Sequence, residues 1–574
     1  MRRKMETRLR FGLAATPLID GLQCKTTRNT INKTLSILAV AAVALLLSSH
    51  AAHAGRKPQK PNILLMLADD LGFSDISCYG GEVSTPTLDH LAAEGLRYTQ
   101  FYNTTRCWPS RAAILTGYYA QQVRRDRTPV GTRALVPGTR PSWAWLLPRY
   151  LSQAGYRSYH SGKWHLDGFP IQQGFDSSYF LADLDRYFTP HRVFIDDKRV
   201  PGPSGSSGYY ATTAIADSAI DQLRKHHLQH GNSPFFEYVA FTAPHFPLQA
   251  LPEDIAKYAH RFDAGWDVLR QQRLARMKAM GIVSCDLSDR TLGVPAWSTL
   301  SPPDQKMWSA RMALHAAMID RMDREIARIL KELTKQGVLD NTLVLFLSDN
   351  GASAERIVRG DGNSKTAIAG AAESYLCLEA GWANLANTPL RLSKIYVHEG
   401  GISTPLIARW PAGISGKGEI RHAPGHLIDL LPTVLDLAGV SHRQIPATAA
   451  PPLPGKSLIS TFGHDASIHR DYLWWYHQGN RALRVGDWKI VAEGTKSSWE
   501  LYNISRDRSE MHNLASAQPD RVIAMDKIWR AHATEFETTA FSEAPPPVRN
   551  RSYRELRVPP VRRSTENPRP AYGK

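Results

Sequence analysis

Residues 62–70 read Asn-Ile-Leu-Leu-Met-Leu-Ala-Asp-Asp, a short and continuous apolar run that ends in two carboxylates. A buried strand of a parallel sheet has this pattern, because helices cover both of its faces. Two further runs, residues 235–241 and 343–347, are also mainly apolar and also lead into polar residues. We expect all three to be central strands that finish at one polar edge of a sheet.

The segments between these runs carry helical signals. Thr85 followed by Pro86 is a typical helix start, and residues 143–154 and 310–336 repeat apolar positions with helical spacing. A further strand is expected at residues 156–161. Strands that alternate with helices predict an α/β fold with a mostly parallel sheet, in which ligands gather where the strands end.

The chain changes character from about residue 460. Four short stretches with strand character are separated by turn residues and predict a small antiparallel sheet: residues 472–477, 481–485, 488–492 and 499–502. We therefore divide the chain into four parts. These are a signal peptide (1–54), a main domain that carries the chemistry (55–460), a C-terminal α+β subdomain (461–545) and a tail rich in proline and arginine (546–574).

The N-terminus has the features of an export signal. An apolar run at residues 35–47 follows Arg28 and Lys33, and residues 52–54 read Ala-His-Ala, which fits a small-x-small cleavage site. The run is too short to span a membrane comfortably. We expect cleavage after Ala54, a secreted or periplasmic protein and no stable membrane insertion. A start codon assigned too early would equally explain the long region before the run, and an uncleaved anchor is the other alternative.

The formal net charge of +17 points to anionic substrates more than to nucleic acid. Residues 1–54 hold eight basic and two acidic residues, so their removal lowers the charge to +11, and seven further arginines lie in the tail. No helix-turn-helix, zinc-finger or RNA-binding pattern accompanies the charge. We expect a basic surface and no nucleic-acid partner.

Five cysteines are few for an exported protein of 574 residues. Cys24 leaves with the signal, and four remain: Cys78, Cys107, Cys285 and Cys377. If Cys107 is committed to chemistry, at most one disulfide forms and one thiol is left over. We expect the stability of the protein to rest on its core.

Acidic and amide side chains follow two of the predicted strands. Asp69 and Asp70 come directly after the first, and Asp349 and Asn350 follow the run at 343–347. Taken singly, each pair is most often a turn or a helix cap. Found together at strand ends, they offer the oxygen ligands that a hard divalent cation such as Ca²⁺ or Mg²⁺ prefers.

A thiol precedes a helix-like segment at residues 107–111, which read Cys-Trp-Pro-Ser-Arg. Pro109 suits a first helical turn, whose free amides attract anions, and Arg111 adds a forked cation suited to a tetrahedral oxyanion. Alone, Cys107 would be an ordinary buried cysteine. Its neighbours in the rest of the chain favour a chemical role.

Basic residues at the ends of two other predicted strands, and a lysine in a later segment, complete the constellation. Lys163 and His165 lie two positions apart and are expected on the same side, His245 follows a proline, and Lys394 precedes Glu-Gly-Gly. Each alone is explained as a solvated lysine, or as a capping or loop histidine. Around a cation and beside Arg111, they form a site for a dianion or a sulfate-like monoester, in which a histidine can protonate the leaving oxygen.

Together these segments resemble the type I, formylglycine-dependent sulfatases of the alkaline-phosphatase-like superfamily. The likeness extends from Pro61 to about Leu514. It rests on six segments that occur in the order of the family. Residues 62–72 resemble a metal-binding segment, 107–111 the modification signature and 162–166 a second signature. Residues 347–351 resemble the other metal-binding segment, 389–402 the segment with the last lysine and 484–503 the C-terminal part.

The resemblance implies a fold and a metal site. The fold is a large, mixed, mostly parallel sheet flanked by helices, with a smaller C-terminal subdomain that bears an antiparallel sheet. Asp69, Asp70, Asp349 and Asn350 would hold the cation together with the modified Cys107. The cation is most often Ca²⁺ in this family, with Mg²⁺ as the alternative.

The resemblance also implies a reaction. A formylglycine-generating or an anaerobic maturation enzyme would oxidise Cys107 to 3-oxoalanine (Cα-formylglycine), whose hydrate attacks sulfur and then expels sulfate through its second hydroxyl. Arg111 would orient the hydrate, and Lys163 and Lys394 would bind the sulfate oxygens. His245 would protonate the departing alcohol, and His165 would deprotonate the second hydroxyl.

The sequence departs from the family pattern near the last lysine. Leu392-Ser393 replaces the frequent Gly-Gly, and His398 stands where an aromatic residue is usual. The segment from Ala352 to Ala386 is expected to shape the substrate pocket through its charged residues Arg356, Arg359, Asp361 and Lys365.

The substrate class expected is a sulfated carbohydrate or an aryl sulfate. The nearest alternative is a phosphomonoester or phosphodiester hydrolase of the same superfamily. A different class is a catalytically silent protein that binds polyanions, in which Cys107 stays unmodified.

Overall fold

The computed structural model describes residues 60–129, 138–184, 186–205, 207–357, 364, 366–442 and 450–543. The predicted signal peptide and the predicted C-terminal tail lie outside these residues. Within them, no helix is long and apolar enough to cross a membrane.

The three predicted central strands lie side by side in an eleven-stranded sheet. Strand β1 (Asn62–Ala68) runs parallel to β7 (Phe235–Ala240) on one side and to β8 (Thr342–Ser348) on the other. Beyond β7 the parallel pairing continues through β3 (Arg157–Lys163) and β4 (Ser177–Leu181). The three polar strand ends therefore lie at one edge of the sheet, as the apolar runs predict.

The outer strands make the sheet mixed. On the β8 side, β9 (Ser403–Arg409) and β2 (Leu96–Tyr102) form antiparallel pairs, β8 with β9 and β9 with β2. Short strands β10 (Glu419–Arg421) and β11 (Gly425–His426) pair in parallel with β2, while β5 (Val193–Ile195) and β6 (Lys198–Val200) form an antiparallel edge beyond β4. The predicted mixed, mostly parallel sheet is confirmed.

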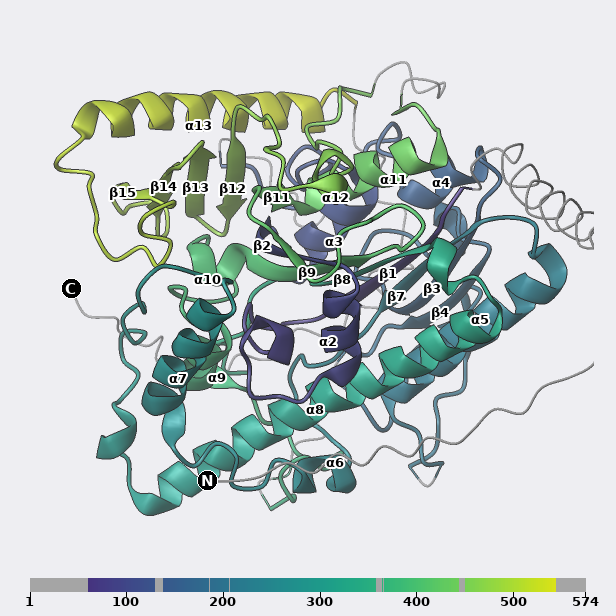
Figure 1. Cartoon of the computed structure of the whole chain (residues 1–574), viewed down its shortest axis with the longest axis horizontal. Helices are drawn as coiled ribbons and strands as arrows, with labels where there is room; N and C mark the ends of the chain where they lie inside the picture. Colours follow the sequence, from purple (N-terminus) through teal and green to yellow (C-terminus); the bar gives the residue numbers. More distant parts are fainter. Residues whose placement is uncertain are drawn as a thin grey trace, which may run out of the picture. The chain divides into compact units, whose positions relative to one another are not determined.

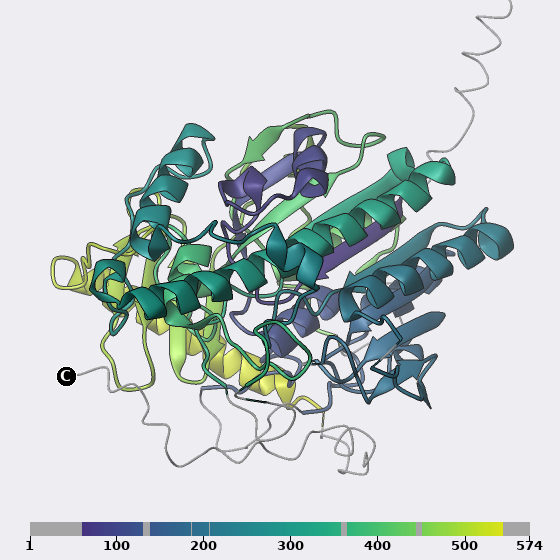
Figure 2. The same ribbon diagram turned by 90° about the horizontal axis from the view of Figure 1, so that it is seen from below.

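Helices cover both faces of this sheet, as the continuous apolar strands require. Side chains of β1 alternate between two cores, with Leu64 and Met66 in one and Leu65 and Leu67 in the other. Helices α5 (Ala211–His230) and α8 (Pro302–Lys335) lie side by side over the first core (Figure 1, Figure 2). Helices that contribute to the second core are α3 (Cys107–Thr116), α4 (Leu147–Ser152) and α11 (Leu430–Ala438).

Helix bounds differ from the predictions where prolines set the start. Helix α8 begins eight residues before the predicted Ala310, because Ser301 caps it by accepting a hydrogen bond from the Asp304 amide and Pro302 occupies the first position. Helix α4 is shorter than the predicted 143–154 and has Pro148 in its first turn. Further helices are α6 (Pro252–Ala256), α7 (Gly265–Ala279), α9 (Glu379–Ala386), α10 (Glu399–Ile402) and α12 (Ser460–Gly463).

Helix α2 (Pro86–Ala93) begins at the predicted proline but is capped from elsewhere in the chain. The Thr85 hydroxyl does not cap it and instead hydrogen-bonds Ser77 and Asp89. The carboxylate of Asp323, on α8, accepts hydrogen bonds from the amides of Thr87 and Leu88 at 3.0 and 2.9 Å. A buried carboxylate thus satisfies donors that a local cap would otherwise serve.

The predicted C-terminal antiparallel sheet is confirmed as a four-stranded meander. It consists of β12 (Leu473–His477), β13 (Asn480–Val485), β14 (Trp488–Ala492) and β15 (Glu500–Asn503). Helix α13 (Pro519–Ala540) lies along one face, where Trp529 stacks on Trp474 at 5.6 Å between ring centroids (Figure 1). Side chains of the other face pack with Tyr102, Val397 and Ile402 of the main sheet region.

A buried ionic cluster joins the C-terminal sheet to the segment that follows Lys394. The Glu399 carboxylate, at the start of α10, binds Lys489 at 2.9 Å and Arg508 at 3.2 Å. Its backbone amide donates to Glu510 at 2.8 Å, and Lys489 also binds Glu510 at 2.8 Å. All four side chains are buried, so the charges compensate one another inside the protein.

Candidate active site

The ends of β1 and β8 bring four predicted metal ligands together. The Asp349 amide donates to the Ala68 carbonyl at 3.2 Å, and the Asp70 amide donates to Asp349 Oδ1 at 3.4 Å. The Asn350 amide nitrogen donates to Asp70 Oδ1 at 2.6 Å. Asp70 has a φ of 64°, a left-handed conformation that aspartate tolerates, and it turns the chain sharply at the strand end. All four ligands are buried: Asp69, Asp70, Asp349 and Asn350.

Helix α3 places Arg111 against these carboxylates. Its Nε and Nη2 both donate to Asp349 Oδ2, at 3.0 and 2.8 Å, and Nη1 donates to the Lys163 carbonyl at 3.0 Å. The guanidinium lies 3.9 Å from Asp69 and is completely buried. Cys107 is the first residue of this helix and is also buried, which raises the pKa of its thiol. The helix thus fixes the thiol and the arginine on one side of the acidic strand ends.

Lys163 is the last residue of β3, and His165 lies two positions beyond it. The Lys163 ammonium contacts the Asp69 carboxylate directly, and both groups are fully buried. His165 has a φ of 59°, and its buried Nδ1 has no hydrogen-bond partner among the residues that the structure describes. Burial, followed by the charges of Lys163 and Arg111, lowers the pKa of His165, so its imidazole is neutral at neutral pH.

Lys394 and His245 both approach Asp70 of the same cluster. The Lys394 ammonium lies 2.8 Å from the Asp70 carboxylate and 3.1 Å from that of Glu355. His245 Nε2 lies 3.6 Å from Asp70 Oδ2, and its Nδ1 lies 2.5 Å from the Phe246 carbonyl. Burial lowers the pKa of His245, although the charge of Asp70 opposes this shift. The structure therefore brings together all of the predicted site residues, from six different regions of the chain.

Two carboxylates of this cluster, Asp69 and Asp349, have pKa values far from the ordinary range of an aspartate. Burial alone would raise the pKa of Asp69, but the combined charges of Lys163, His245, Arg111 and Lys394 outweigh it and hold that pKa well below the usual value. Burial and the neighbouring charge of Asp69 raise the pKa of Asp349. Strong opposite shifts within one cluster are typical of functional sites, and structural ion-pair networks also produce them.

Two buried oxygens of the cluster fit a cation. Asp69 Oδ1 and Asn350 Oδ1 have no hydrogen-bond partner in the described part of the chain. Asp69, Asp70 and His245 each offer a ligand atom, and these atoms all lie within 4.8 Å of one another. Buried oxygens without donors are costly, and a hard divalent cation bound by carboxylate and amide oxygens would satisfy them.

Three further residues lie at this site and were not identified from the sequence: Glu355, Arg106 and Trp108. Glu355 accepts from Arg106 Nη1 at 2.8 Å and binds Lys394, and the Arg106 guanidinium lies over the Trp108 ring at 5.1 Å. No motif singles out Glu355, because it is one acidic residue in a long polar segment. Arg356, which we expected to shape the pocket, is exposed and lies 4.0 Å from Glu379. The other charged residues expected there, Arg359, Asp361 and Lys365, lie outside the described residues.

The remaining cysteines do not form disulfides within the described chain. Cys78, Cys107, Cys285 and Cys377 are all buried and free. The expectation of at most one disulfide therefore holds with none formed.

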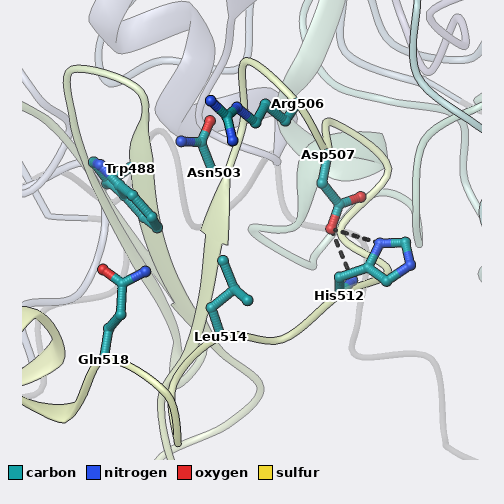
Figure 3. A pocket seen from close by; sticks show the side chains of 7 residues that line it. All are labelled: Trp488, Asn503, Arg506, Asp507, His512, Leu514 and Gln518. Carbon is teal, nitrogen blue, oxygen red and sulfur yellow. Dashed lines mark hydrogen bonds and ion pairs between the residues drawn. The ribbon is translucent and has the colours of Figure 1, made fainter.

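A surface pocket of about 490 Å³ lies away from the buried cluster, on the C-terminal sheet. Figure 3 shows Trp488 and Leu514 beside polar side chains, with Asp507 bonded to His512. None of the predicted site residues lines it; its lining is Trp488, Asn503, Arg506, Asp507, His512, Leu514 and Gln518.

Comparison with known proteins identifies the family. The Sulfatase family model matches residues 61–440. An uncharacterized sulfatase of Schizosaccharomyces pombe is 33% identical over 531 residues, which cover 83% of this chain and 94% of that protein. The chain belongs to the sulfatase family.

Other relatives of this sulfatase agree with its activity and fold. An arylsulfatase of Klebsiella aerogenes is 31% identical over 435 residues, covering 70% of this chain and 91% of the relative. The structure of BT4656 in complex with its substrate D-glucosamine-2-N,6-O-disulfate has a TM-score of 0.55 at 23% identity, covering 85% of this chain and 99% of that one. The sulfatase is thus a sulfuric ester hydrolase.

The C-terminal part of the sulfatase matches a second family model. This model, "N-sulphoglucosamine sulphohydrolase, C-terminal", covers residues 391–531. The match begins just before Lys394 and includes the antiparallel sheet and most of α13. It therefore contains the Glu399 cluster that connects these two parts.

Proposed function

We propose that this sulfatase hydrolyses sulfate esters of carbohydrates or aryl alcohols through a formylglycine made from Cys107, with a divalent cation bound beside it. The observation that carries the proposal is the buried cluster in which three cations face three carboxylates next to Cys107. The cations are Arg111, Lys163 and Lys394, and each contacts at least one of the carboxylates.

The predicted metal ligands fit Ca²⁺, with Mg²⁺ as the alternative. Asp69, Asp70, Asp349 and Asn350 would hold the ion together with the modified Cys107. Two of their oxygens have no hydrogen-bond partner among the described residues, which supports this assignment. A bound divalent cation supplies positive charge that stabilises a deprotonated nucleophile and the oxygens of the ester.

Formylglycine, as its hydrate, supplies both the nucleophile and a second hydroxyl that allows sulfate to leave. Arg111 is fixed by two hydrogen bonds to Asp349 and would hold the hydrate in place. Lys163 and Lys394 would exchange their carboxylate contacts for the sulfate oxygens and offset the charge that develops during the reaction. These two lysines contact different carboxylates, Lys163 that of Asp69 and Lys394 that of Asp70.

The two histidines would transfer protons. His245 Nδ1 lies at the Phe246 carbonyl and would donate its proton there, which leaves Nε2 on the side of Asp70. In the charged form of the ring, which the neighbouring Asp70 carboxylate favours, Nε2 also carries a proton, and Nε2 is the atom that would protonate the departing alcohol. His165 has a lowered pKa, so it is neutral and able to accept the proton of the second hydroxyl.

Two properties of the relatives support the substrate class. One relative is named as an arylsulfatase, and one structural neighbour was solved with a disulfated glucosamine. Four basic side chains close to the cluster, including Arg106, favour an anionic substrate.

Two measurements on protein from its native host test the proposal. Trypsin should release residues 107–111 as a pentapeptide, because Arg106 precedes it and Arg111 ends it, and its mass distinguishes an aldehyde from a thiol. The same preparation should hydrolyse p-nitrophenyl sulfate, and Cys107→Ala should not. An unmodified thiol in an active enzyme would exclude the formylglycine route. A clear preference for phosphate esters would favour a phosphohydrolase instead.

We also propose export and enzymatic maturation. Cleavage after Ala54 would release the mature protein to the periplasm or the medium, and N-terminal sequencing of the isolated protein tests it. Expression with and without a formylglycine-generating or anaerobic maturation enzyme should change the fraction of converted Cys107. An unchanged fraction would mean that these enzymes do not act on this chain.

A further inference from the structure

Glu355 places a negative charge beside one of the proposed sulfate-binding lysines. Its carboxylate lies 3.1 Å from Lys394 Nζ and 2.8 Å from Arg106 Nη1. The side chain is 16% exposed, and that of Lys394 is 1% exposed. Burial alone would raise the pKa of Glu355, but the charges of Lys394 and Arg106 lower it well below the usual value, so the group is ionised.

Glu355 differs from the other carboxylates of the cluster in its contacts. Asp69, Asp70 and Asp349 lie at the strand ends where the cation is proposed to bind. Among the described residues, the Glu355 side chain contacts Arg106, Lys394 and Ser353 and none of these three aspartates. Its charge therefore acts on the anion-binding side of the site.

The surrounding contacts hold Glu355 close to Lys394. The Lys394 amide donates to the Ala352 carbonyl at 3.1 Å, which ties the two segments together. The Ser353 hydroxyl lies 3.3 Å from the Glu355 carboxylate. Arg106 is itself held over the Trp108 ring. If the Lys394 ammonium exchanged its carboxylate partner for a bound anion, these contacts would still hold Glu355 in place.

We propose that Glu355 is a specificity residue that favours singly charged sulfate esters over doubly charged phosphate esters. This inference rests on the proposed function of the same site. Sulfate and phosphate monoesters are both tetrahedral and of similar size, so hydrogen bonding distinguishes them poorly. They differ in charge, because a phosphate monoester loses its second proton with a pKa of about 6 and a sulfate monoester carries one charge. A fixed carboxylate beside the anion disfavours the dianion more than the monoanion.

The test compares two esters of one alcohol. We would measure kcat/KM for p-nitrophenyl sulfate and p-nitrophenyl phosphate at about pH 8, where the phosphate ester is a dianion. Glu355→Gln keeps the shape and removes the charge, and Glu355→Asp keeps the charge. Glu355→Ala is a second neutral variant for the case in which the glutamine protein does not fold. The mass of peptide 107–111 is measured in each preparation, so that the rates refer to equally matured enzyme.

Glu379→Gln is the matched control. Glu379 lies in the same segment, is 19% exposed and binds Arg311, which is outside the cluster. It therefore removes the same charge from a similar environment without a contact to Lys394.

We expect Glu355→Gln to raise the phosphate-to-sulfate ratio of kcat/KM by about tenfold or more. Glu355→Asp and Glu379→Gln should stay within about threefold of the native ratio. If Glu355→Gln lowered kcat/KM equally for both esters, the proposal would be overturned, since Glu355 would then only position Lys394. If Glu379→Gln changed the phosphate-to-sulfate ratio as much as Glu355→Gln does, the proposal would also be overturned, because the change would then result from the net charge of the protein.

Failure of the proposed function is seen separately in the native protein. If its sulfate ester hydrolysis does not exceed that of Cys107→Ala, the formylglycine mechanism is wrong whatever the ratios are. If the native protein prefers the phosphate ester, both the function and the role of Glu355 are wrong.

Discussion

Replacement of Glu237 by glutamine is expected to remove a pH dependence from the stability of this sulfatase. Glu237 lies in the middle of β7, between Leu64 of β1 and Tyr159 of β3. It is completely buried, and both of its carboxylate oxygens lack a hydrogen-bond partner in the described chain. Burial raises the pKa of this carboxyl well above its usual value of 4.5.

The sign and size of the effect follow from this raised pKa. Above about pH 4.5 the unfolded chain releases the proton, whereas the native state keeps it. The contribution to stability is therefore complete below that pH and is lost as the pH rises towards the pKa of the folded state. The loss is about 1.4 kcal/mol per pH unit, or about 2 kcal/mol between pH 5 and pH 6.5. Glutamine has nearly the same shape and does not titrate.

Urea unfolding of both proteins at the two pH values, followed by tryptophan fluorescence, measures the effect. The native protein should lose about 2 kcal/mol relative to Glu237→Gln when the pH is raised. Glu325→Gln serves as a control, because Glu325 is equally buried but binds Arg328 and Thr213. It should lower the stability at both pH values. Parallel losses in the native and Glu237→Gln proteins would refute the reasoning.

Three further predictions concern the site and one helix. Arg111→Ala should lower kcat/KM at least about 10²-fold and the free energy of unfolding by about 3–5 kcal/mol, because Asp349 loses its buried partner. Enzyme rates and thermal unfolding measure the two effects, and a variant that keeps its activity would contradict the proposed role of Arg111. Asp323→Ala should lower the free energy of unfolding by about 1–2 kcal/mol through the lost cap of α2, without changing kcat. Asp323→Asn should recover most of this lost stability, as measured by urea unfolding. Dialysis against EDTA should abolish hydrolysis and lower the melting temperature, and Ca²⁺ or Mg²⁺ should restore both; full activity in metal-free protein, checked by elemental analysis, would exclude a catalytic ion.

The central sheet and its polar edge were predictable because burial on both faces leaves a strong sequence pattern. The runs at 62–67 and 343–347 are continuous and apolar, and both strands lie within one residue of the predicted bounds. Adjacent parallel strands end at the same edge, so the proximity of Asp69 to Asp349 follows from general rules. The same pattern concealed Glu237, which lies in an otherwise apolar run and reveals nothing about its missing partner.

Contacts between distant segments could not be predicted. Asp323 caps a helix that begins more than two hundred residues earlier, and Glu355 joins Lys394 to Arg106 across a similar separation. Neither residue belongs to a motif. Their roles arise only when the fold places a carboxylate next to particular amides or cations, and a single sequence carries no local signal of that event.

The Glu399 cluster has a consequence for the order in which the protein is completed. Most site residues lie at or before Asn350, and the ribosome makes them early. The segment with Lys394, however, is held by Glu399, whose carboxylate and amide find their partners on Lys489, Arg508 and Glu510. Until these are synthesised, Glu399 has no buried countercharge and its segment cannot dock stably. A reaction centre encoded mainly by residues before 351 is therefore finished only after residues 489–510 have been made.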